Sequence, residues 1–98
     1  MTTTGAIAKT NMPIDDIISE LRAFIIKQFA VPENDDYFTN TVDLFNYGYI
    51  DSLGAAELTS FVETRFGIGF TDADWANVPL SSTEEIARFV SKRQLGEI

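Results

Sequence analysis

The sequence predicts an all-α fold, an irregular four-helix bundle with a long first loop and a short third helix. Apolar residues recur at spacings of three and four in three segments, which is the period of a helix that buries one face. Each apolar stripe must be covered by another element, so three of them favour a bundle. The 98 residues suffice for one domain. We expect it at 13–93, between a flexible tail at 1–12 and a frayed end at 94–98.

The first helix is expected at about 13–30. Pro13 suits the first helical position, because the N–H of that position has no partner within a helix and proline lacks it at no cost. Pro32 disfavours the helical conformation in the residue before it and so ends the helix. The apolar stripe of this helix consists of Ile14, Ile17, Ile18, Leu21, Phe24, Ile25 and Phe29.

Residues 32–51 form a connection of unusual length, and such a loop is typically functional or held down by its own side chains. The residues expected to pin it to the core are Phe38, Val42, Leu44, Phe45 and Ile50. Gly48 is expected to supply a backbone angle that other residues resist. Three tyrosines are interpreted as packing residues whose hydroxyls reach water, Tyr37, Tyr47 and Tyr49. Alternatively, Tyr47 or Tyr49 lines the approach to Ser52.

The second helix is expected at about 52–66, with Gly67 as its C-cap. Asp51 is a strong N-cap residue, which would leave the Ser52 hydroxyl exposed at the positive end of the helix, where an attached phosphate is favoured. The alternative, more common for an isolated serine, is that Ser52 itself is the cap. The inward stripe consists of Ala55, Leu58, Phe61, Val62 and Phe66. The exposed face is expected to contain Ser52, Ala56, Thr59 and Glu63, flanked by Leu53, Glu57, Ser60 and Thr64.

A short third helix is expected at about 72–76, because Thr71 is a suitable cap and acidic residues follow it. Trp75 within it would line a cleft or, as a single Trp more often does, pack in the core. The last helix begins with a capping box, in which Ser82 and Glu85 satisfy backbone amides reciprocally. Its inward residues are Ile86, Phe89 and Val90, and its basic end contains Lys92 and Arg93.

Composition excludes several functional classes. The net charge of −8 disfavours nucleic-acid binding and suits partners with basic docking patches. The chain has no Cys and no His, which removes disulfides, thiol catalysis, Ser-His hydrolysis and most zinc sites. The acidic run at 33–36 lacks the ligand pattern of a calcium loop, so no metal site is expected. The absence of Cys fits a cytoplasmic protein, which is the expected localisation. The apolar runs are too short to span a bilayer, and the N-terminus lacks the charged start and apolar core of a signal peptide.

The motif Asp51-Ser52-Leu53 follows Leu44, Phe45 and Gly48 and opens a helix. With this context the chain resembles the acyl and peptidyl carrier proteins over roughly 13–92. The resemblance implies an acyl-carrier-like four-helix bundle that is not itself an enzyme. It also implies that Ser52 bears a 4'-phosphopantetheine arm, added from coenzyme A by a phosphopantetheinyl transferase. The arm would carry acyl or aminoacyl groups as thioesters between partner enzymes.

The same resemblance implies that the second helix is the recognition face of a monomeric carrier. Its partners would be a loading ligase and downstream acyltransferases or synthases of a fatty acid, polyketide or nonribosomal peptide pathway. Leu53 matches an apolar partner contact, and Glu57 and Glu63 match acidic family positions. Ser60 stands where fatty-acid carriers frequently have a larger apolar residue.

Gly54 departs from the fatty-acid type, which usually has an acidic residue there, so one charge would be missing from the docking face. In this respect the chain is more similar to D-alanyl and stand-alone peptidyl carriers. A helical interaction module without a prosthetic group remains the alternative, and it would tolerate Ala at Ser52. A hydrolase with Ser52 as nucleophile would lack both His and a nucleophile elbow.

Overall fold

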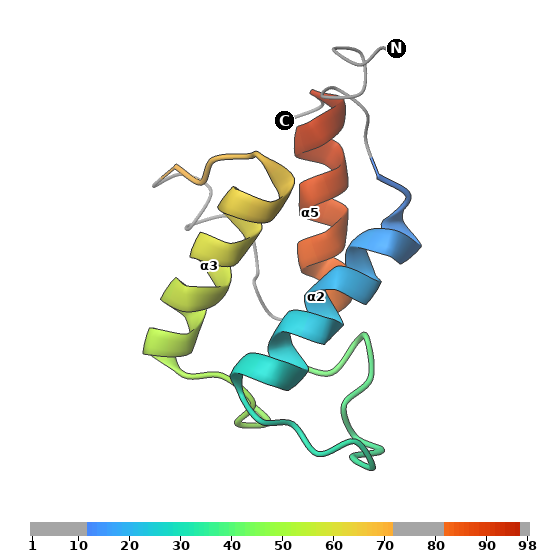
Figure 1. Ribbon diagram of the computed structural model, residues 1–98, viewed down its shortest axis with the longest axis vertical. Coiled ribbons are helices and arrows are strands. Elements are labelled where there is room, and N and C mark those ends of the chain that lie inside the picture. The colour runs from blue at the N-terminus through green and yellow to red at the C-terminus, as the bar shows by residue number, and fades with distance from the viewer. Residues whose placement is uncertain (1–11, 72–81, 97–98) are drawn as a thin grey trace.

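The computed structural model describes residues 12–71 and 82–96, and these residues form three α-helices without a strand. The helices are α2 (Ile14–Gln28), α3 (Ser52–Phe66) and α5 (Thr83–Leu95). Helices α3 and α5 lie beside each other, α2 runs obliquely to both, and the long loop between α2 and α3 closes one end of the molecule (Figure 1).

The all-α fold predicted from the sequence is thereby confirmed for this part of the chain. The short helix expected at 72–76, with Trp75, lies outside the described residues, so the predicted count of four helices stays a prediction. The domain limits 13–93 likewise stay a prediction. Within the described ranges, no helix is long and apolar enough to cross a membrane.

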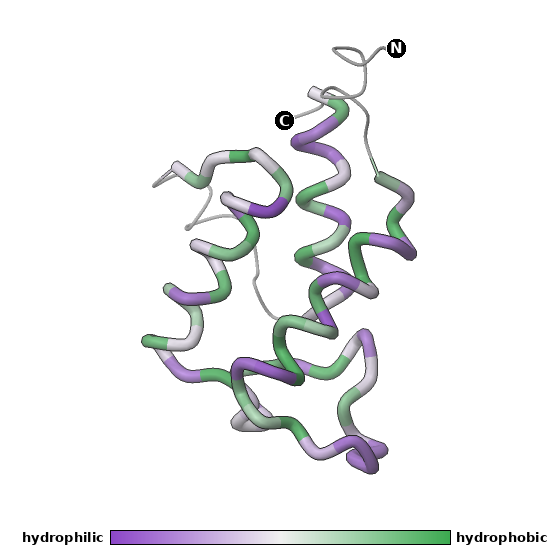
Figure 2. The backbone as a smooth tube through the Cα atoms, in the orientation of Figure 1, coloured by the Kyte–Doolittle hydropathy of each residue, from purple (hydrophilic) through white to green (hydrophobic). Residues whose placement is uncertain are grey.

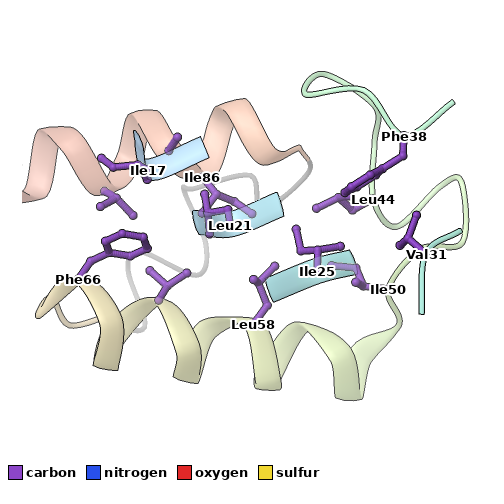
Figure 3. Close-up of a cluster of buried hydrophobic side chains, with 13 residues drawn as sticks. Ile17, Leu21, Ile25, Val31, Phe38, Leu44, Ile50, Leu58, Phe66 and Ile86 are labelled. Carbon is purple, nitrogen blue, oxygen red and sulfur yellow. The ribbon is translucent and has the colours of Figure 1, made fainter. Parts of the chain in front are cut away.

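The core lies where the three helices and the long loop meet (Figure 3). Along each helix, hydrophobic residues recur among hydrophilic ones (Figure 2). All three helices and the loop contribute side chains with no exposed area: Ile17, Leu21, Ile25, Leu44, Leu58, Val62, Ile86 and Val90. The apolar stripes predicted from the helical period therefore face a common core, as burial of apolar surface requires. The exception is Ile14 at the start of α2, which was placed in the stripe but is 37% exposed.

Helix α2 begins and ends slightly inside the expected range of 13–30. Pro13 is its N-cap rather than its first helical residue, and Phe29 is its C-cap. The helix ends because Ala30 adopts the left-handed conformation, with φ of 54°. The amide of Val31 then donates to the carbonyl of Ile26 at 3.1 Å, which is the bond of a Schellman motif.

The long loop is pinned by Phe38, Leu44 and Ile50, which are buried as expected. The prediction was wrong for Phe45, whose side chain is 39% exposed. The cause is a tight turn in which the Asp43 carboxylate accepts hydrogen bonds from the amides of Phe45 and Asn46 at 3.0 and 2.9 Å. This turn directs Leu44 inward and its neighbour Phe45 outward.

The three loop tyrosines do not behave alike. Tyr37 and Tyr47 are 76% and 66% exposed, so the interpretation of these two as packing residues is wrong. Only Tyr49 packs, against Phe38 with ring centroids 5.2 Å apart. Its hydroxyl donates to the Asp35 carboxylate at 2.8 Å, which ties two turns of the loop together. Gly48 has φ of +79°, the conformation expected of it.

Long side chains join α2 to α3. The rings of Phe24 and Phe61 stack with centroids 4.1 Å apart, and the Glu20 carboxylate receives two hydrogen bonds from Arg65 at 2.6 and 2.9 Å. These contacts help to set the position of α3, and therefore of its first turn, against the end of α2.

Helix α5 starts at its predicted cap, where the Ser82 hydroxyl accepts from the Glu85 amide at 3.1 Å. Ile86, Phe89 and Val90 are buried, as expected. The helix continues to Leu95, past the residue at which fraying was expected, and ends at Gly96 with φ of 79°. The Gln94 side chain supports this last turn, because its amide nitrogen donates to the Phe66 carbonyl at 3.3 Å.

Candidate functional site

The start of α3 is built around the carboxylate of Asp51. One of its oxygens accepts a hydrogen bond from the Gly54 amide at 2.8 Å, and the Asp51 carbonyl accepts from the Ala55 amide at 2.8 Å. Asp51 is therefore the N-cap, as predicted, and the alternative in which Ser52 caps is wrong. Ser52 occupies the first helical position, and its side chain is exposed.

This position is suited to an attached phosphate. Among the described residues, the structure gives the amides of Ser52 and Leu53 no hydrogen-bond partner, as expected for the first turn of a helix. These amides and the positive end of a helix of 15 residues attract an anion. A phosphodiester on the Ser52 hydroxyl would be attached beside these donors without displacing the cap.

An open cleft of about 520 Å³ begins at Ser52. Its other lining residues come from the end of α2 and from the second half of the long loop, Phe29, Phe45, Gly48, Tyr49, Ile50 and Asp51. Of the two tyrosines that the sequence placed near the helix start, Tyr49 lines this cleft, whereas Tyr47 lines a separate depression on the loop. A hydroxyl at a helix N-terminus with a cleft beside it fits a long phosphate-linked group.

Burial and the hydrogen bond to the Asp35 carboxylate raise the pKa of Tyr49 above its ordinary value, burial being the larger cause. The negative charge of Asp35 adds to this effect. The wall of the cleft therefore presents a neutral phenol over the physiological pH range. In the last turn of α3, the Glu20 carboxylate raises the pKa of Arg65 and keeps that side chain charged.

Gly54 is buried rather than exposed on the outer face of α3. A Cβ at this position would lie 2.9 Å from Cε1 of Phe29 and 3.3 Å from the capping oxygen of Asp51. The idea that Gly54 removes a charge from the docking face is therefore wrong, because an acidic side chain could not stand there without moving Phe29. Sequence reasoning missed this contact, although a glycine inside a helix is a recognised sign of close approach.

The exposed face of α3 is narrower than predicted. Leu53 is 70% exposed, and Glu57 and Ser60 are exposed as expected. Thr59, which was placed on this face, is 8% exposed and donates its hydroxyl to the Ala55 carbonyl at 2.8 Å. The prediction failed because a hydroxyl that bonds back to its own helix can be buried beside an apolar stripe.

Two acidic residues of α3 have different surroundings. Glu57 lies at the exposed surface, where it accepts a hydrogen bond from the Gln28 side chain at 3.3 Å. Glu63 is half-buried, and its carboxylate accepts from the Phe70 amide at 2.8 Å. Glu63 therefore holds the segment that follows α3, whereas Glu57 remains accessible to a partner.

Comparison with protein families identifies what the chain is similar to. Residues 19–90 match the family model described as a phosphopantetheine attachment site. The matched range includes Ser52, the cleft and most of all three described helices. A search among curated proteins found none that matches the chain.

Proposed function

Because the chain belongs to the family of acyl and peptidyl carrier proteins, which hold 4'-phosphopantetheine covalently, we propose that Ser52 is its attachment residue. The observation that supports this assignment most directly is the exposed Ser52 hydroxyl at the first position of α3, with Asp51 performing the capping. In the transfer reaction the Ser52 oxygen would bond to the pyrophosphate phosphorus of coenzyme A that bears the pantetheine, and the P–O bond from this phosphorus to the adenosine-side phosphate would break. The adenosine bisphosphate would leave, and the hydroxyl proton would pass to the transferase.

The chain's own residues would position the arm and hold its phosphate. The amides of Ser52 and Leu53 are available as donors at the phosphate, and the positive helix end opposes its charge. The arm supplies a thiol for thioester formation, which this chain without Cys does not. The contribution of the protein is tethering, which raises the effective concentration of the cargo at each partner enzyme.

We propose that the cargo is an acyl or aminoacyl group, held as a thioester. It would be carried between enzymes of a fatty acid, polyketide or nonribosomal peptide pathway. The sequence Asp51 to Gly54 supports the aminoacyl class, through its similarity to D-alanyl and stand-alone peptidyl carriers. The contact of Gly54 with Phe29 gives a packing reason for the same glycine.

For the docking surface we propose three exposed residues of α3, Leu53, Glu57 and Ser60. An apolar contact next to negative charge suits the transferase, the loading ligase and the downstream enzymes if these carry basic patches. The structural contact of Glu63 makes it a poorer member of this surface than the sequence suggested. Glu57→Lys should slow the transfer of phosphopantetheine at low salt, and an unchanged rate would remove Glu57 from the surface.

Intact mass tests the attachment residue. The protein is incubated with coenzyme A, Mg²⁺ and a broad-specificity phosphopantetheinyl transferase. The wild type should gain one phosphopantetheine, and Ser52→Ala should gain none while keeping its helical circular dichroism. Ser19→Ala is the matched control, because Ser19 is an exposed serine of α2 outside the proposed docking surface, and it should be modified like the wild type. Modification of Ser52→Ala would reject the assignment, and an unmodified but folded wild type would favour an interaction module without a prosthetic group.

A further inference from the structure

We propose that the cleft between the long loop and the start of α3 is the resting site of the phosphopantetheine arm, with Phe45 as its outer wall. The inference rests on the proposed attachment at Ser52. It adds that the arm, when no partner holds it, lies against the loop side of the molecule rather than extending into solvent.

Continuity with the attachment point identifies the occupant. Ser52 itself lines the cleft, so a group bonded to its oxygen starts at the rim and need not cross other surface to enter. The volume of about 520 Å³ falls in the range of sites that hold small organic molecules.

The cleft matches the arm in having no charged side chain away from Ser52. The one acidic side chain in its lining is Asp51, which lies at the Ser52 end and accepts the hydrogen bond of the Gly54 amide. The free amides of the first turn would face the phosphate there. Away from that end the lining is aromatic, aliphatic or backbone, including Phe45 and Ile50. The arm beyond its phosphate is also uncharged and carries methyl groups and amides, so no charge would be buried against this wall.

The wall is held in place without a ligand. Phe45 follows the buried Leu44, whose carbonyl accepts from the amides of Tyr49 and Ile50 at 2.9 and 3.1 Å. The Asp43 carboxylate binds the amide of Phe45 itself. An aromatic ring kept partly exposed by a rigid turn gains by being covered, and little conformational freedom is lost when the arm covers it.

The inner end of the cleft is fixed by Phe29. Its ring approaches Gly54 so closely that no side chain fits between them, and it packs edge-on against Phe24 with centroids 6.1 Å apart. Residues from α2, the loop and α3 therefore meet around one preformed groove that ends at Ser52.

Amide chemical shifts test the inference on intact protein. Apo and modified wild type are compared by ¹H–¹⁵N correlation spectra. Modification should shift the amides of Gly48, Tyr49 and Ile50 as well as those beside Ser52. In Phe45→Ser the shift changes at these three loop amides should fall at least several-fold.

Two control variants distinguish the effect of losing the Phe45 ring from the effect of any substitution in the loop. Phe45→Tyr keeps the ring and should keep the loop shifts. Tyr47→Ser removes an exposed ring of the same turn that does not line this cleft, and it should leave the shifts as in the wild type. The apo spectrum of each variant shows whether it is folded.

The outcomes also separate this inference from the proposed function. If the mass shows modification but shift changes stay within residues 51–54, or persist unchanged in Phe45→Ser, the cleft is not the resting site although Ser52 is the attachment residue. If Ser52 gains no arm, the proposed function itself fails.

Discussion

At the scale of single residues, the close packing around Gly54 explains why a glycine stands where fatty-acid carriers usually have an acidic residue. The position lies in the first turn of α3, where the Phe29 ring and the Asp51 carboxylate both approach it. Alanine would favour the helix by about 1 kcal/mol or less in a first turn. Overpacking typically costs about 1–3 kcal/mol, so the steric term decides.

We therefore predict that Gly54→Ala lowers the free energy of unfolding by about 1 kcal/mol. In a Phe29→Leu background the same change should be neutral or stabilising, because the obstructing ring is gone. Chemical denaturation of the four proteins of this cycle measures the coupling. Gly69→Ala is the control, since a Cβ there meets no atom within 4 Å. Equal losses at both glycines, or no coupling to Phe29, would contradict the steric explanation.

Sequence reasoning placed correctly most residues that follow the helical period and those with a local chemical role. Asp51 was identified as the cap because its carboxylate bonds an amide three residues away. Phe45 and Thr59 were misplaced because their exposure depends on turn geometry and on neighbouring helices. For the same reason, the cleft at Ser52 could not be predicted, since Phe29 reaches it from another helix.

At the scale of elements, the end of α2 is the unusual feature. Ala30 has φ of 54° at the position where a Schellman motif normally has glycine. A Cβ makes this conformation unfavourable by about 1–2 kcal/mol. The capping bond and the burial of Val31 nevertheless hold the chain in it.

Ala30→Gly should accordingly raise the free energy of unfolding by about 0.5–1 kcal/mol, because the relief of strain exceeds the added flexibility of the unfolded chain. Ala23→Gly, an exposed site inside α2, should lower it by a similar amount. Thermal and denaturant unfolding report both changes. Destabilisation by glycine at both positions would show that the Ala30 conformation carries no strain.

Helix boundaries were predictable to different degrees for a related reason. The limits of α3 agree with the prediction because Asp51 and Gly67 mark both ends with local chemistry. The end of α2 was placed two residues late, since an alanine in the left-handed conformation gives no sequence signal. The end of this helix depends on the burial of Val31, which is a tertiary contact.

At the scale of the whole molecule, the loop contact between Tyr49 and Asp35 couples stability to alkaline pH. The folded state raises the pKa of Tyr49, so folding favours the neutral phenol. Its contribution to stability is complete below the ordinary tyrosine pKa of about 10 and is lost as pH rises through the raised value.

We expect stability to fall in this alkaline range, and Asp35→Asn to bring the Tyr49 titration to lower pH. Tyr37→Phe and Tyr47→Phe together leave Tyr49 as the only one of the three tyrosines, so its tyrosinate absorbance is measured without overlap. Parallel unfolding curves in the same background follow the loss of stability. An unchanged titration in Asp35→Asn would mean that the hydrogen bond has no influence on the phenol.

Because Asp51 and not Ser52 caps α3, folding does not depend on the modification of the serine. The two hydrogen bonds that Asp51 accepts at the helix start exist without any attached group, and the serine hydroxyl contributes neither of them. Under the proposed assignment, maturation can then follow folding by any interval. A newly synthesised chain can be folded before it meets its transferase. Loss of the arm would return the protein to this folded apo form and would not unfold it.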